Sequence, residues 1–157
     1  MPTKREQEVD ENKLTNRYKV ILIIIVSLFG LSYFTSSDIS LFIEINVLIC
    51  FGVWAWLFID YKLLQINRLY VYSLILSFFI IGYGQIIVRF YGNYDIAKLI
   101  GGTKTPLLLL IIQRILRFGF KLVVKREPII AKQPSSAADL IYALVLYVSS
   151  SWFFISS

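Results

Sequence analysis

The sequence predicts an all-α integral membrane protein, a bundle of five transmembrane helices with one short helix on the outer membrane surface. Of its 157 residues, 57% are hydrophobic and 17% are charged, whereas soluble domains carry about 25% charged residues. The apolar residues form long blocks instead of following a helical or strand period. A block of ~20 helical residues crosses the ~30 Å core of a bilayer, so these blocks indicate a chain whose solvent is lipid.

The expected elements begin with a polar tail, residues 1–17, ahead of a membrane domain, residues 18–157. The five expected spans cover residues 18–34, 41–59, 69–90, 106–124 and 137–155. The long leader of mixed charge and the absence of an A-x-A site after the first block argue against a cleaved signal peptide. We therefore expect the first block to remain as a span behind a mobile tail.

Local signals set the borders of the last two spans. Thr105 and Pro106 are typical of a helix start, since Thr caps and Pro fits the first helical position. Ser136 with Asp139 three residues later resembles a capping box before the fifth span. Gly101–Gly102 is expected to end the short amphipathic stretch that forms the outer-surface helix.

The orientation follows from lysine and arginine, which favour cytoplasmic loops. With the N-terminus inside, thirteen of the 16 basic residues lie inside and three, Arg89, Lys98 and Lys104, lie outside. If the fourth block did not cross, nine basic residues would lie outside, so it should cross. The sequence thus predicts a cytoplasmic N-terminus and an external C-terminus in a cell (inner or plasma) membrane.

The fourth span carries basic residues along one face. Arg114, Arg117, Lys121 and Lys125 are spaced three, four and four, which places them within a stripe about 80° wide. One interpretation is a helix anchored to inner headgroups; the other is an anion or lipid-headgroup site open to the cytoplasm. Counted from Pro106, Arg114 should lie near the middle of the bilayer, where anchoring explains it least well.

A second set of polar residues is expected in the outer leaflet. Glu44 and Arg89 should lie at similar depth in antiparallel spans, and Gln85 lies one turn deeper than Arg89 on its face. They are predicted to form an intramembrane ion pair, which relieves the cost of isolated charges in lipid. The functional alternative is a proton or cation site at Glu44.

Small and polar residues predict two helix contacts. Ser73, Ser77 and Gly84 share one face of the third span, which indicates close approach of a neighbouring helix. Asn46 lies within the second span and is expected to form a hydrogen bond across helices.

The residue content argues against most familiar chemistry. The chain has no histidine and one cysteine, Cys50, which removes the usual zinc ligands, an intrachain disulfide and the commonest general base. We therefore expect no metal, no cofactor and no enzyme. The predicted function is a non-catalytic membrane protein that acts through helix contacts with a membrane protein partner, as an assembly subunit or immunity-type protein does. The alternative is a small transporter or a protein that binds lipid phosphate or another anion through the basic stripe. Anionic headgroups at the inner face are expected partners, and nucleic acid is not.

Overall fold

The computed structural model describes residues 4–91, 97–128 and 137–155. These residues form five α-helices: α1 Lys4–Ser32, α2 Ile39–Ile59, α3 Asn67–Phe90, α4 Ala97–Val124 and α5 Ala137–Ile155. Two short 3₁₀ helices, η1 Tyr33–Thr35 and η2 Tyr61–Gln65, follow α1 and α2. The described part of the chain contains no strand, which confirms the all-helical fold.

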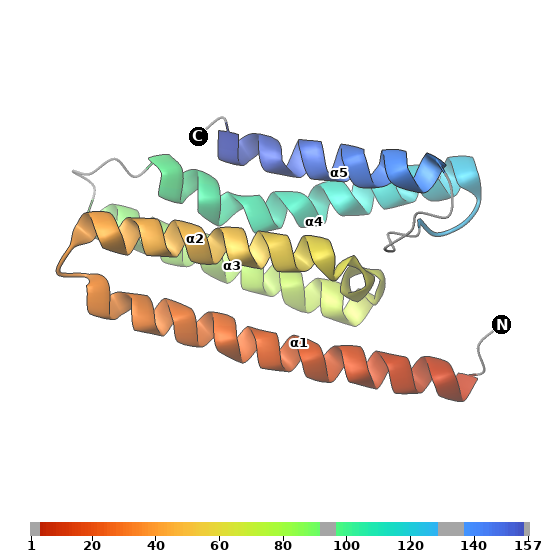
Figure 1. Ribbon diagram of the computed structural model, residues 1–157, viewed down its shortest axis with the longest axis horizontal. Helices are drawn as coiled ribbons and strands as arrows, with labels where there is room; N and C mark the ends of the chain where they lie inside the picture. Colours follow the sequence, from red (N-terminus) through yellow and green to blue (C-terminus); the bar gives the residue numbers. More distant parts are fainter. Residues whose placement is uncertain (1–3, 92–96, 129–136, 156–157) are drawn as a thin grey trace.

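The five helices run side by side, and consecutive helices point in opposite directions (Figure 1). In this view α2 and α3 lie between α1 on one side and the pair α4 and α5 on the other. α4 is the central element, because it packs against α2, α3 and α5. The loop that joins α1 to α2 lies at one end of the bundle, together with the C-terminal end of α5. The α2–α3 connection and the start of α5 lie at the opposite end of the bundle.

Whereas the sequence predicts five spans, three helices within the described residues are long and apolar enough to cross a membrane. They comprise Glu11–Thr35, Ile39–Ile59 and Asn67–Phe90. The described apolar part of α5, Ala137–Ser151, is shorter. α4 is longer, but basic residues interrupt its apolar sequence. Length and composition alone therefore identify α1, α2 and α3 as candidate spans.

The first helix begins earlier than expected. α1 starts at Lys4, so most residues assigned to a polar tail form its first turns. Its polar start and apolar continuation make one uninterrupted helix of 29 residues. Near its end, the Ser32 hydroxyl donates hydrogen bonds to the Phe29 carbonyl and to Asn46 Oδ1 of α2, 3.3 Å away. The prediction that Asn46 bonds across helices is thereby confirmed.

The fourth helix also begins earlier, at Ala97, and Pro106 lies inside it. The expected outer-surface helix is wrong as a separate element, because its described part forms the first turns of α4. Thr105 does not act as a cap: its hydroxyl donates to the Gly101 carbonyl one turn back in the same helix, at 2.9 Å. Proline removes one backbone donor, and packing on three sides keeps the helix continuous despite that loss. The predicted capping role of Ser136 lies outside the described residues.

The packing of α3 on α4 confirms the close contact expected from small residues. Ser73 and Ser77 are fully buried, and their hydroxyls donate to carbonyls one turn earlier in α3. Gly84 faces Thr103 of α4, and a Cβ at this position would lie 2.7 Å from Thr103 Cγ2. The main core is formed by buried side chains from all five helices, including Ile25, Leu57, Leu76, Leu109 and Leu146.

Candidate functional site

The basic face of α4 is held by a carboxylate that sequence reasoning missed. Arg117 donates from Nε to Glu127 Oε2 at 2.8 Å and from Nη2 to Glu127 Oε1 at 2.9 Å. Lys121 forms an ion pair with the same carboxylate. The hydrogen bond from Arg117, followed by that from Lys121, lowers the pKa of Glu127 to about 2. A planar fork gripped at two points is the strongest arrangement for such a pair, so Arg117 is already occupied.

Arg117 is also bound to the backbone of the α2–α3 connection. Its Nη1 lies 3.4 Å from the carbonyl oxygens of Leu64 and Gln65 in η2. The side chain is 13% exposed, against 37% for Glu127. Charge neutralisation by Glu127 and hydrogen bonding to two carbonyls thus fix the end of α4 against η2.

The Arg114 side chain reaches the start of α3. Its Nη1 donates to Asn67 Oδ1 at 3.2 Å, and its guanidinium lies 5.0 Å from the centre of the Tyr70 ring. Asn67 is the first residue of α3, so the guanidinium reaches the level where α3 begins. The expected depth of Arg114 was counted from Pro106, which is not the start of the helix.

Lys125 does not share the stripe. α4 ends at Val124, and Lys125 adopts a left-handed backbone conformation with a φ of 56°. This conformation ends a helix and turns the chain away from its axis. Of the four predicted stripe residues, the structure brings Arg117 and Lys121 together on Glu127, places Arg114 on Asn67, and leaves Lys125 exposed beyond the helix.

A second ion pair closes the connection from α4 to α5. Arg126 donates to both carboxylate oxygens of Asp139, at 3.0 and 2.7 Å, and its guanidinium lies 5.5 Å from the centre of the Phe120 ring. The Asp139 side chain is completely buried. The sequence signal for both ion pairs was available: Glu127 and Asp139 are the acidic residues nearest to the basic stripe along the chain.

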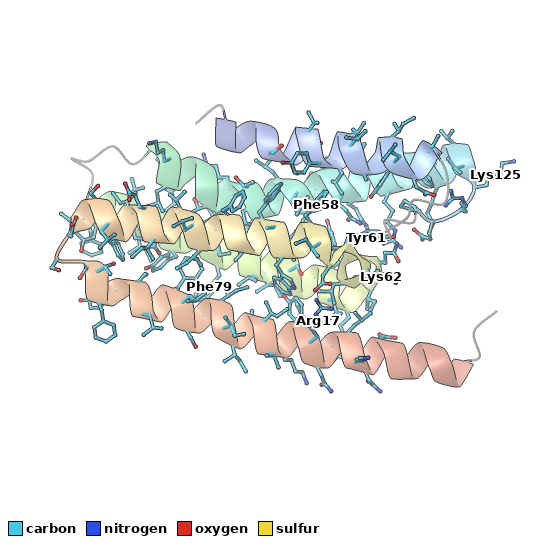
Figure 2. The ribbon with its side chains drawn as sticks, viewed as in Figure 1. Arg17, Phe58, Tyr61, Lys62, Phe79 and Lys125 are labelled. Carbon is cyan, nitrogen blue, oxygen red and sulfur yellow. The ribbon has the colours of Figure 1, made fainter. Side chains whose placement is uncertain are left out.

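The same end of the bundle carries most of the basic side chains. Arg17, Lys62 and Lys125 all lie toward this end in Figure 2. The Tyr61 hydroxyl donates to the Pro128 carbonyl at 2.6 Å, which ties η2 to the segment after α4. Arg17 of α1 pairs with Asp60 at the end of α2, at 2.9 Å. We call this end, where Asp60, Tyr61 and Glu127 lie among the basic side chains, the basic end.

The polar residues expected to pair in the outer leaflet are not brought together. Glu44, Gln85 and Arg89 are all exposed, and no ion pair among the described residues joins Glu44 to Arg89. Each residue lies on the side of its helix opposite the buried face. The sequence predicts similar positions of Glu44 and Arg89 along the helix axes. The rotation of α2 and α3 about those axes points both side chains outward.

Gln113 is a further polar residue that sequence reasoning did not single out. Its side chain is fully buried in α4, and both amide atoms lack a hydrogen-bond partner among the described residues. The Tyr142 hydroxyl donates to the backbone carbonyl of Gln113 at 3.4 Å, not to the Gln113 side-chain amide.

Among the described residues, these features define a helical bundle with three candidate membrane-spanning helices and three arginine–carboxylate pairs at one end. No protein-family model matches this chain, and no curated protein or solved structure is significantly similar to it.

Proposed function

We propose that this protein is a non-catalytic membrane subunit that works through helix contacts with a protein partner in the same membrane. In this proposal all five helices cross a cell membrane, with the basic end in the cytoplasm and the C-terminus outside. The packing of α4 supports the five crossings, and a polar face of α3 supports the protein partner.

The position of α4 supports five crossings. It packs against α2, α3 and α5, and α2 and α3 are candidate spans. A helix packed along two spans shares their depth, so the charges of α4 do not exclude it from the bilayer. Helices of 28 and 19 residues extend ~42 and ~28 Å, enough for α4 and α5 to cross. Arg114 and Arg117 reach the basic end, where headgroups and water begin.

Cysteine labelling tests this topology. The native Cys50 is fully buried and should not react, whereas Ser37, Lys62 and Lys125 are exposed. With a membrane-impermeant maleimide, Ser37→Cys should be labelled in intact cells. Lys62→Cys and Lys125→Cys should be labelled only after permeabilisation. Labelling of Lys125→Cys in intact cells would mean that α4 does not cross.

The observation that carries the partner proposal is the exposed face of α3 formed by Gly82, Gln85 and Arg89, which we call the α3 polar face. The three positions fall within about 60° of one another around the helix. All three are exposed, and Gln85 and Arg89 form no hydrogen bond with another described side chain. In lipid, an amide without a partner is costly, and small and polar residues are enriched where membrane helices meet. A partner helix seated on this face would satisfy Gln85 and fill the space beside Gly82.

The anion-site alternative receives less support from the geometry. It needs an arginine free to grip a phosphate or carboxylate, yet Arg117 already binds Glu127 at two points. Arg114 is bound to Asn67 and lies against Tyr70.

Native-size measurement in mild detergent tests the partner proposal. The wild-type chain should migrate as a larger complex, and Gln85→Leu or Arg89→Gln should release the single bundle. Ser27→Leu is a matched control, since Ser27 is an exposed polar residue on α1. A complex that is equally stable in all variants, or a wild-type chain that migrates alone in its native membrane extract, would contradict the proposal.

A further inference from the structure

An apolar groove runs between α1 and α3 in the half of the bundle next to the basic end. It has a volume of about 500 Å³. Phe79, labelled in Figure 2, lies at the end of the groove farther from the basic end. One face of α1, from Thr15 to Val26, forms one wall of the groove, and one face of α3, from Leu69 to Phe79, forms the other.

The length of the groove matches one leaflet. Its walls extend over eleven residues of α3, from Leu69 to Phe79, and the ten steps between them span about 15 Å at the helical rise. The hydrocarbon core is ~30 Å thick, so ~15 Å is the depth of one leaflet. With the basic end at the cytoplasmic headgroups, as proposed above, the groove extends from the headgroup level of the inner leaflet to the middle of the bilayer.

The walls of the groove are mainly apolar over this length. A volume of about 500 Å³ spread along about 15 Å accommodates a flexible hydrocarbon chain.

The mouth of the groove is polar and basic. Thr15, Lys19 and Tyr72 line this end, and Arg68 reaches it by donating from Nε to the Tyr72 hydroxyl at 3.1 Å. Lys19 and Arg68 are exposed, and neither forms an ion pair with another described side chain. Glu11 of α1 interacts electrostatically with Arg68 but lies outside ion-pair distance. Two cations without a bound carboxylate therefore flank an apolar groove one leaflet deep.

We infer that this groove binds an anionic glycerophospholipid of the inner leaflet. One acyl chain lies between α1 and α3, and the phosphate lies between Lys19 and Arg68, with the Thr15 and Tyr72 hydroxyls beside it. The lipid fills the space that α1 leaves by packing mainly against α2. The site is distinct from the α3 polar face, which lies in the outer half of α3 and on another side of the helix.

Native mass spectrometry of the purified full chain tests this inference. The protein is titrated with phosphatidylglycerol or with phosphatidylcholine of the same acyl chains. Phosphatidylglycerol should be retained more tightly, and Lys19→Gln and Arg68→Gln should each weaken its binding about fivefold, the share of one basic residue at a membrane surface. Lys62→Gln is the matched control, because Lys62 is exposed at the same end but does not line the groove. Equal losses for all three variants would overturn the inference, since they would reflect net charge alone.

A second pair of variants tests the acyl chain. Ile75→Trp fills the groove without changing charge and should reduce phosphatidylglycerol retention, whereas Ile141→Trp on the exposed face of α5 should not. Soluble glycerol phosphate should compete poorly. If it displaces the lipid at similar concentration, or if Ile75→Trp binds as the wild type does, the acyl chain plays no part and the site takes a soluble anion instead.

Discussion

Substitution of Gly84 by alanine tests the close contact between α3 and α4. A Cβ at position 84 would lie 2.7 Å from Cγ2, 3.0 Å from Oγ1 and 3.2 Å from Cβ of Thr103. Thr103 is 2% exposed and its hydroxyl donates to the Ile100 carbonyl at 3.1 Å, so it has little room to turn. The two helix backbones must move apart to accept one added methyl group.

The magnitude follows from comparison with Gly82, one half-turn away on the same helix. A Cβ at Gly82 meets no atom within 4 Å, so Gly82→Ala should raise the free energy of unfolding by ~0.5–1 kcal/mol through helix propensity alone. Gly84→Ala has the same propensity gain, but overpacking of a tight contact costs ~1–3 kcal/mol. The difference between the two variants should therefore be ~1–3 kcal/mol in favour of Gly82→Ala.

Reversible unfolding in mixed detergent micelles measures this difference. Thr103→Ala removes the two nearest atoms, so Gly84→Ala should be less harmful in a Thr103→Ala background than in the wild type. Equal stabilities for Gly84→Ala and Gly82→Ala, or strict additivity of Gly84→Ala with Thr103→Ala, would refute the α3–α4 register described above.

Three further outcomes follow from the end of the bundle and from the core. Arg117 and Lys121 lower the pKa of Glu127 to about 2 from an ordinary value of 4.5. Their stabilisation is present above pH ~4.5 and lost as the pH falls toward 2, and unfolding of Glu127→Gln should lack this dependence. Gln113→Leu should raise the unfolding temperature, because it removes a buried amide without a described partner, a cost of ~1–3 kcal/mol; a decrease would reveal a bound water. Lys125→Gly should stabilise by ~1 kcal/mol in the same assay, since glycine favours a φ of 56°, and no gain would exclude that strain.

The sequence was sufficient for the helices but not for their register against one another. The apolar blocks predicted α2, α3 and α5 closely, because a span needs a fixed length of apolar chain. The start of α4 was misplaced by nine residues, since Thr105 and Pro106 match a helix start in isolation. Only tertiary packing shows that the helix continues through them, and the expected depth of Arg114 was counted from this misplaced start.

The partners of the charged residues were harder to predict for a second physical reason. The depth of a residue can be counted along a span, but the direction of its side chain depends on how each helix rotates against its neighbours. Glu44 and Arg89 point outward for this reason. Glu127 is the acidic residue nearest to the stripe along the chain, which is a signal for its pairing with Arg117. The turn of the chain after Val124, which brings the two side chains together, cannot be seen from spacing within one helix.

Photo-crosslinking from the α3 polar face is the most direct test of the proposed function. A photoreactive residue in place of Gln85 should give one discrete product in native membranes, heavier than the chain by the mass of a single partner. The same residue in place of Ile141, which is exposed on α5, should react with lipid alone. The product at position 85 should disappear when Gly82→Leu blocks the face. Reaction only with lipid at both positions would contradict a membrane partner seated on α3.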